Sequence, residues 1–255
     1  MKTAGAVLGI SLVIAMVSPA VRAADIRVFS GGAPQQVLQS LAPEFERASG
    51  HRTQFTFAVV GAIQQKIEAG ERPDLILLPV PLMNAIDKAV PLRPESRAVL
   101  ARVGIGVIVR DGAARPDIST PEAVCAMLLS ARKVALSEPS TPSGGHLVRQ
   151  FAQLGIADAM TPKLVAKNAI DGGAALVASG EADIGLYLLS EVQTFKGITV
   201  VGLLPTPVQS FVVYGTGIPA ANAAPEPGIA LIKFAIDPAR GERWKAGGFE
   251  LVSGR

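Results

Sequence analysis

The chain has 255 residues, of which 18% are charged and 49% hydrophobic, a composition typical of a globular protein and too apolar for a disordered one. Its 24 Lys and Arg nearly balance its 21 Asp and Glu, and two of the basic residues, Lys2 and Arg22, precede every acidic one. The sequence also contains no run of basic residues, so its charge does not support a nucleic-acid partner. A single cysteine, Cys125, excludes an internal disulfide framework, and two distant histidines, His51 and His146, exclude a histidine-built metal centre.

Residues 1–23 predict a secretory signal peptide. A basic start at Lys2 is followed by an apolar stretch at 4–17, which is shorter than the roughly 20 residues that cross a membrane. A small-residue pattern then ends at Ala23. We expect cleavage after Ala23 and a periplasmic location; the alternative is an uncleaved membrane anchor.

The first part of the mature chain alternates predicted strands and helices. Strands are expected at 26–30, 53–59 and 74–78, and helices at 34–48, 62–69 and 82–89. In the first helix Val37, Leu41 and Phe45 recur every four residues, so they share one face. This β-α-β-α-β order predicts a parallel sheet with helices on its faces.

A second alternating set follows a long predicted strand at 103–110. It comprises helices at 120–131, 144–154 and 172–179 and strands at 133–137, 164–167 and 183–188, and the chain ends with strands at 198–203 and 209–215 and helices at 227–236 and 238–245. We therefore predict an α/β fold of two lobes. The chain would cross between them near 103–108 and 204–211, so that residues 24–103 with 211–255 form lobe 1 and 104–210 form lobe 2.

Four loops of small residues each follow a predicted strand and precede a helix. Their candidate ligand-binding residues are Ser30, Gly31, Gly32, Ala33, Val60, Gly61, Ser143, Gly144, Gly172 and Gly173. The first turn of a helix has free N–H groups and a partial positive charge, so several such turns facing one cleft would bind an anion. The alternative is that these residues are ordinary caps and turns. None of the loops matches a phosphate-loop or dinucleotide fingerprint, and we expect no cofactor.

The sequence offers no obvious catalytic group. His146 lies three residues after Ser143, but without a nucleophile-elbow motif it is expected at the rim of a cleft, or else in solvent or packed inside the fold. No acid–base pair and no metal cluster is evident. We therefore expect a protein that is not an enzyme.

Three further side chains are assigned from their positions. Tyr187 and Leu188 are adjacent on a predicted strand, so only one of them can face a cleft. Asp171 is expected to cap the helix that begins at Gly172. Trp244 is expected to anchor the last helix.

Four segments, DIRVFSGGA at 25–33, AIQQKIEAGERPDL at 62–75, ARVGIGV at 101–107 and SGEADIGL at 179–186, resemble the periplasmic molybdate-binding proteins of ABC importers. The resemblance runs from about residue 25 to the C-terminus. It implies a two-lobed type II periplasmic binding protein, a monomer whose ligand lies in the cleft between lobes. It also implies a small anionic solute, such as a metal oxyanion, and a membrane permease as partner.

The resemblance carries the ligand site over in part. The family places serines where this chain has Ala33 and Val60, and a tyrosine where it has Leu188, whereas Ser143 and Gly144 match a third ligand-binding turn. The first hypothesis for the ligand, implied by the resemblance, is molybdate, tungstate or a similar small oxyanion. The second is a small organic carboxylate whose apolar part meets Val60 and Leu188. A third hypothesis, from another class of protein, is a secreted hydrolase.

Overall fold

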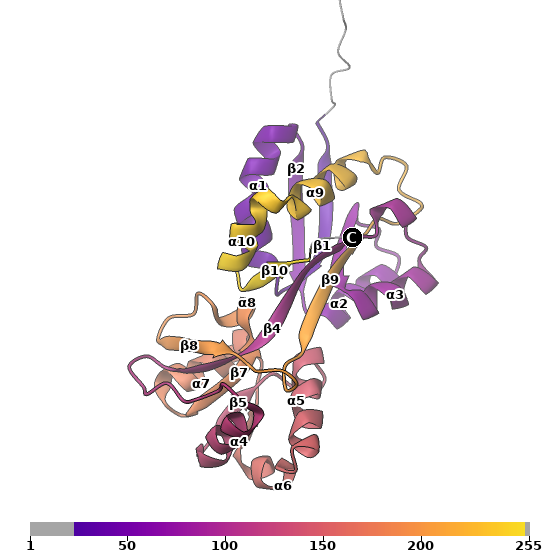
Figure 1. Cartoon of the computed structure of the whole chain (residues 1–255). Helices are drawn as coiled ribbons and strands as arrows, with labels where there is room; N and C mark the ends of the chain where they lie inside the picture. Colours follow the sequence, from indigo (N-terminus) through magenta and orange to yellow (C-terminus); the bar gives the residue numbers. More distant parts are fainter. Residues whose placement is uncertain (1–22, 253–255) are drawn as a thin grey trace, which may run out of the picture.

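The structure, a computed structural model, describes residues 23–252, so the predicted leader lies outside the described residues except for Ala23. Figure 1 shows its strands and helices in two groups at the two ends of the long strand β4. The strands are β1 (Asp25–Gly31), β2 (Arg52–Ala58), β3 (Leu75–Pro79), β4 (Val99–Arg110), β5 (Val134–Leu136), β6 (Leu164–Ala166), β7 (Ile184–Leu188), β8 (Ile198–Leu203), β9 (Phe211–Gly217) and β10 (Phe249–Leu251). The helices are α1 (Gln35–Ser49), α2 (Val60–Glu68), α3 (Val80–Ala89), α4 (Pro121–Ser130), α5 (Pro142–Gln153), α6 (Ala157–Met160), α7 (Ala174–Ser179), α8 (Leu189–Val192), α9 (Glu226–Ile236) and α10 (Gly241–Ala246).

The strands pair in the order β2-β1-β3-β9-β4-β7-β5-β6, with β8 and β10 also paired to β4. Pairing is parallel within β1, β2 and β3 and within β5, β6 and β7. It is antiparallel wherever β4 or β9 takes part. The twelve residues of β4 belong to both groups, because one end pairs with β9 and β10 and the other with β7 and β8.

The helices cover both faces of the first group of strands. Val28 packs into a core with the buried face of α1, whereas the next residue, Phe29, packs with Ile63 of α2 and Met83 of α3. Opposite faces for successive residues follow from the pleat of a strand. The predicted apolar face of α1 is confirmed, since Val37, Leu41 and Phe45 are buried.

The structure differs from the predicted elements mainly in short segments. The residues expected to begin a helix at 172 form instead a π turn at Ala169–Gly173, in which Gly172 has a φ of 104°, and α7 starts only at Ala174. That positive φ interrupts a right-handed helix. The short elements α6, α8 and β10 are also additions to the predicted order.

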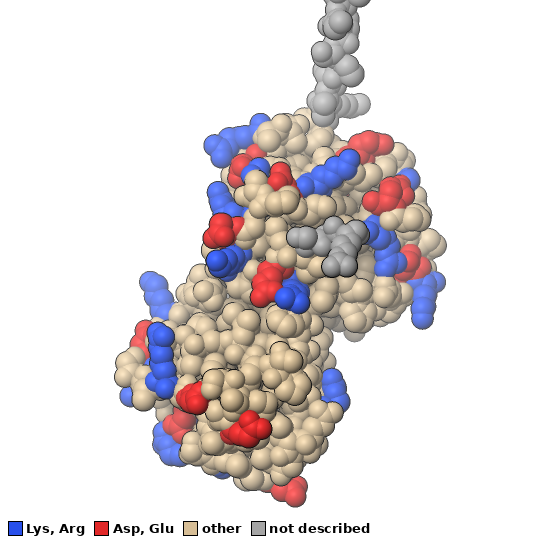
Figure 2. Space-filling view, viewed as in Figure 1, with Lys and Arg blue, Asp and Glu red and all other residues tan. Residues whose placement is uncertain are grey.

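Basic and acidic side chains are mixed on the face of the molecule seen in Figure 2, at both of its ends. Within residues 23–252 no helix has both the length and the apolar character needed to cross a membrane.

Candidate functional site

A cavity of about 530 Å³ opens where the two groups of strands and helices meet. Its lining residues come from both groups: Gly32, Ala33, Gln35, Gln36, Gln39, Phe57, Ala58, Val59, Val60, Pro79, Val212 and Tyr214 from the first, and Ser137, Thr141, Pro142, Ser143, Asn168, Ile170, Leu188, Ser190 and Glu191 from the second. The volume lies in the range of sites for small molecules. Five of the predicted site residues, Gly32, Ala33, Val60, Ser143 and Leu188, are among this lining.

The loop before α5 brings a hydroxyl to the cavity. Thr141, and not Ser143, caps the helix, because its Oγ1 accepts a hydrogen bond of 3.1 Å from the N–H of Gly144. Ser143 is buried and its Oγ lies 3.5 Å from Thr141 Oγ1. The hydroxyl of Ser143 is thus not committed to capping and lines the cavity. Gly144 is required by packing, since a Cβ there would collide with the carbonyl oxygens of Ser137 and Glu138.

The first two loops contribute apolar surface and backbone. Ser30 is fully buried, is not among the lining residues, and donates its hydroxyl proton to the carbonyl of Gly31 at 2.9 Å. A Cβ on Gly31 would lie 3.0 Å from Val60 Cγ1, so this glycine lets α2 approach β1. Gly32, in contrast, has open space beside its Cα and lines the cavity.

Of the predicted pair Tyr187 and Leu188, Leu188 faces the cavity. Tyr187 points to the other side of β7 and donates its hydroxyl proton to the carbonyl of Lys167 at 3.0 Å. Burial, with a smaller contribution from Glu191, raises the pKa of Tyr187. A tyrosine that the sequence did not indicate, Tyr214, enters the lining from β9, next to Val212 on the same face.

The glycines of the fourth predicted loop, Gly172 and Gly173, do not reach the cavity. Gly172 and Gly173 are not among the lining residues, and a Cβ on Gly173 would collide with the carbonyl of Lys167 and the hydroxyl of Tyr187. Asp171 does not cap α7; it accepts a hydrogen bond of 3.0 Å from the amide of Asn168. Of the predicted residues, Gly61 and Gly144 also lie outside the lining.

One hydroxyl and one carboxyl side chain complete the lining, and neither was predicted from the sequence. Ser190 and Glu191 lie on α8, directly after β7, and line the cavity. Within residues 23–252, Ser190 Oγ and Glu191 Oε2 are buried atoms with no hydrogen-bond partner. Burial, followed by the nearby charge of Asp171, raises the pKa of Glu191 to about 7. Carboxyl groups of this kind are common in functional sites.

The other candidates take structural positions. His146 Nε2 lies 2.9 Å from the carbonyl of Val208, outside the lining. Burial raises the pKa of the Cys125 thiol, which does not favour a reactive thiolate. In the described part of the chain, no group of three His, Cys, Asp or Glu is placed to hold a metal ion.

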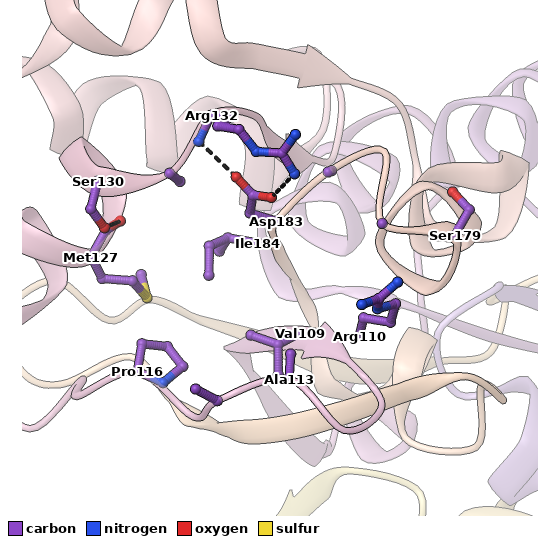
Figure 3. Close-up of a pocket in the computed structure, with 14 residues that line it drawn as sticks. Val109, Arg110, Ala113, Pro116, Met127, Ser130, Arg132, Ser179, Asp183 and Ile184 are labelled. Atoms are coloured by element: carbon purple, nitrogen blue, oxygen red, sulfur yellow. Dashed lines mark hydrogen bonds and ion pairs between the residues drawn. The ribbon is translucent and has the colours of Figure 1, made fainter.

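A second cavity, of about 450 Å³, lies wholly within the second group (Figure 3). Its side chains include Arg132 and Asp183, which are joined by an ion pair with an Nη2–Oδ1 distance of 2.6 Å. The backbone N–H of Arg132 also donates to Asp183 at 2.7 Å. None of the predicted ligand-binding residues lines this cavity, whereas five line the cavity between the groups, which is therefore the candidate site.

The chain is similar both to solute-binding proteins and to an isomerase. The model of the bacterial extracellular solute-binding protein family matches residues 26–250. An aconitate isomerase of Pseudomonas is 30% identical over 218 residues, which cover 82% of this chain and 81% of the isomerase. The molybdate-binding protein of Escherichia coli is 25% identical over 197 residues, covering 76% of each chain. The structure of the periplasmic molybdate-binding protein of Azotobacter vinelandii superposes with a TM-score of 0.70 at 19% identity, covering 89% of this chain and all of that one.

These matches confirm the predicted resemblance to molybdate-binding proteins and the α/β fold of periplasmic binding proteins. They also correct one prediction. The expectation that the chain is not an enzyme is wrong, because a relative with 30% identity over most of its length is named an isomerase. The sequence lacked an obvious acid–base pair, and the buried carboxyl of Glu191 became apparent only with the fold.

Proposed function

The chain belongs to the bacterial extracellular solute-binding protein family, and from this membership we propose that its solute is a small organic carboxylate bound in the cavity between the two groups. In this proposal, residues 24–103 with 211–255 form lobe 1 and residues 104–210 form lobe 2. The division of the lining residues supports these lobes, since every lining residue from Ser137 to Glu191 lies in lobe 2 and all others lie in lobe 1. The cavity is then the ligand cleft.

The lining of the cavity is the observation that carries the carboxylate proposal. Apolar surface comes from Phe57, Val60, Leu188 and Val212. Hydrogen-bonding groups come from Ser143 and from the side-chain amides of the glutamines in α1. A tetrahedral oxyanion has no apolar part, and its buried charge requires hydrogen bonds on all sides. An organic acid has both parts, and the volume of about 530 Å³ admits one. Aconitate, the compound in the name of the isomerase relative, is an acid of this class.

Charge recognition would come from backbone and neutral side chains. No lysine or arginine is among the residues that line this cavity. The first turns of α1, α2 and α5 all contribute to the lining, and each presents free N–H groups and a partial positive charge. Such groups bind carboxylates and oxyanions alike.

Molybdate or tungstate remains the second candidate, supported by the similarity to the Escherichia coli molybdate-binding protein. In both cases we propose that the protein is exported to the periplasm and that a membrane permease of an ABC importer is its partner.

Calorimetry tests the choice of ligand. We expect aconitate and the saturated tricarballylate to bind more tightly than molybdate, tungstate or sulfate. Ser143→Ala removes a donor to a charged group, worth roughly 1.5–3 kcal/mol, so the Kd should rise about 10- to 150-fold. Ser130→Ala is the control, because its hydroxyl donates to the carbonyl of Met127 at the end of α4. Nanomolar binding of molybdate with no binding of carboxylates would contradict the proposal.

A further inference from the structure

Two residues that line the cavity carry polar atoms that the fold leaves unsatisfied. Ser190 Oγ and Glu191 Oε2 are buried without hydrogen-bond partners in the part of the chain that the structure describes, and both residues line the cavity. An unsatisfied buried polar atom typically destabilises a protein by about 1–3 kcal/mol. Such atoms are rare in native structures, and two neighbouring ones at one cavity point to a function for the site.

The surroundings of Glu191 keep its carboxyl group close to a balance between its two protonation states. The titratable groups that interact electrostatically with it are Asp171 in the π turn, Tyr187 on β7 and Tyr214 on β9. The neighbouring β4 and the turn before β10 contact α8 at Gly106 and Gly248, which carry no charge. Burial is the main cause that raises the pKa of Glu191 to about 7, and the charge of Asp171 adds to it. A group with such a pKa can both accept and return a proton at neutral pH.

We propose that Glu191 transfers protons to and from the bound ligand, and that the chain thereby isomerises an unsaturated organic acid. This inference rests on the proposed function, because it requires a carboxylate in the cavity. The substrate class is an acid with a CH₂ group between a carboxylate and a carbon–carbon double bond. Glu191 is the group suited to the reaction because it is the one carboxylate among the residues that line the cavity, and the described part of the chain forms no hydrogen bond to its Oε2.

The reaction needs only a base and its conjugate acid. The ionised Glu191 removes a proton from the CH₂ group, and the electron pair of that C–H bond spreads over the three carbons of the allylic unit and into the attached carboxylates. The protonated Glu191 then returns the proton to the other terminal carbon, and the double bond moves. No atom is gained or lost and nothing is oxidised or reduced. In aconitate the shifted double bond gives the same connectivity, so the step interconverts geometric isomers.

Hydrogen-bond donors around the cavity would stabilise the negative charge that develops. Ser143 and the side-chain amide of Gln35 belong to residues that line the same cavity as Glu191. These groups are neutral, so they position the acid and accommodate charge without holding Glu191 permanently ionised, as a neighbouring lysine would.

Proton exchange measures the transfer directly. The protein is incubated with trans-aconitate in D₂O, and proton NMR follows the loss of the CH₂ signal and the appearance of the cis isomer. We expect both in the unmutated protein, with a rate that rises between pH 6 and pH 8 as Glu191 ionises. Glu191→Gln should slow exchange at least about 100-fold, the lower range for general acid–base catalysis, while the Kd for tricarballylate changes less than about 10-fold.

Matched variants separate this role from a structural one. Glu138→Gln removes an exposed carboxyl outside the cavity lining and should leave exchange unchanged. Glu191→Asp keeps the acid but withdraws it by one carbon, and should retain slow, pH-dependent exchange. Undiminished exchange in folded Glu191→Gln would overturn the inference. Binding of aconitate and tricarballylate without any exchange in the unmutated protein would also overturn it and leave the proposed function standing. Absence of binding by every carboxylate would refute the proposed function itself.

Discussion

At the scale of single residues, Glu191 stands out because the fold stabilises its neutral form. Its pKa is raised from 4.5 to about 7, chiefly by burial. Between these values the folded protein retains a proton that the unfolded chain has released. The stability from this residue is therefore fully present below about pH 4.5 and is lost as the pH rises through about 7.

This shift predicts a difference in the pH dependence of unfolding. Glu191→Gln replaces the carboxyl by a neutral group of similar shape, so the unliganded variant should gain stability relative to the unmutated protein as the pH rises from 5 to 8. The relative gain approaches about 1.4 kcal/mol per pH unit between the two pKa values, and it levels off above about pH 7, where Glu191 is ionised in the folded protein as well. Denaturant unfolding at several pH values measures it, with Glu138→Gln as the control that should follow the unmutated protein. Parallel stability curves for Glu191→Gln and the unmutated chain would show that Glu191 is not desolvated in solution.

At the scale of elements, matched helix caps distinguish stability from binding. Thr141 caps α5 at the cavity, and Thr120 caps α4 away from it by accepting a hydrogen bond of 3.2 Å from the N–H of Ala123. Replacing either threonine by alanine should lower the free energy of unfolding by about 1 kcal/mol. Only Thr141→Ala should also weaken ligand binding, because α5 brings Ser143 into the cavity. Equal affinities of the two variants, by calorimetry, would place the ligand away from α5.

The sequence predicts the long elements better than it predicts the residues that line the cavity. The periodic apolar face of α1 and the anchoring Trp244 were both predicted; Trp244 is fully buried and donates its indole N–H to the carbonyl of Ala235 at 2.9 Å. A helix of four residues such as α8 is too short to show periodicity. Ser190 and Glu191 therefore gave no signal, although both follow a strand that was predicted. Tyr214 was missed for another reason, since its strand reaches the cavity only through long-range pairing with β3 and β4.

At the scale of the whole molecule, export determines where the protein works. The predicted leader ends at Ala23, and β1 begins at Asp25, so cleavage there removes no residue of the first strand. We expect protein taken from the periplasm to have an intact mass that begins at Ala24. A mass that retains residues 1–23 would identify the segment as a membrane anchor and contradict the predicted location.

The shared strand β4 also determines the order in which the two groups of strands can fold. Residues 104–210 form one uninterrupted stretch of chain, whereas β3 of the first group pairs with β9, which lies more than 130 positions later in the chain. Closing such a long loop is slow compared with forming local contacts. The second group can thus assemble while the edge of β3 is still open, and the exposed backbone of β3 is a site for aggregation until β9 arrives. Because β4 pairs in both groups, the pairing of its two ends joins the groups into one cooperative unit. A destabilising substitution at either end of β4 should therefore lower the free energy of unfolding of the whole chain.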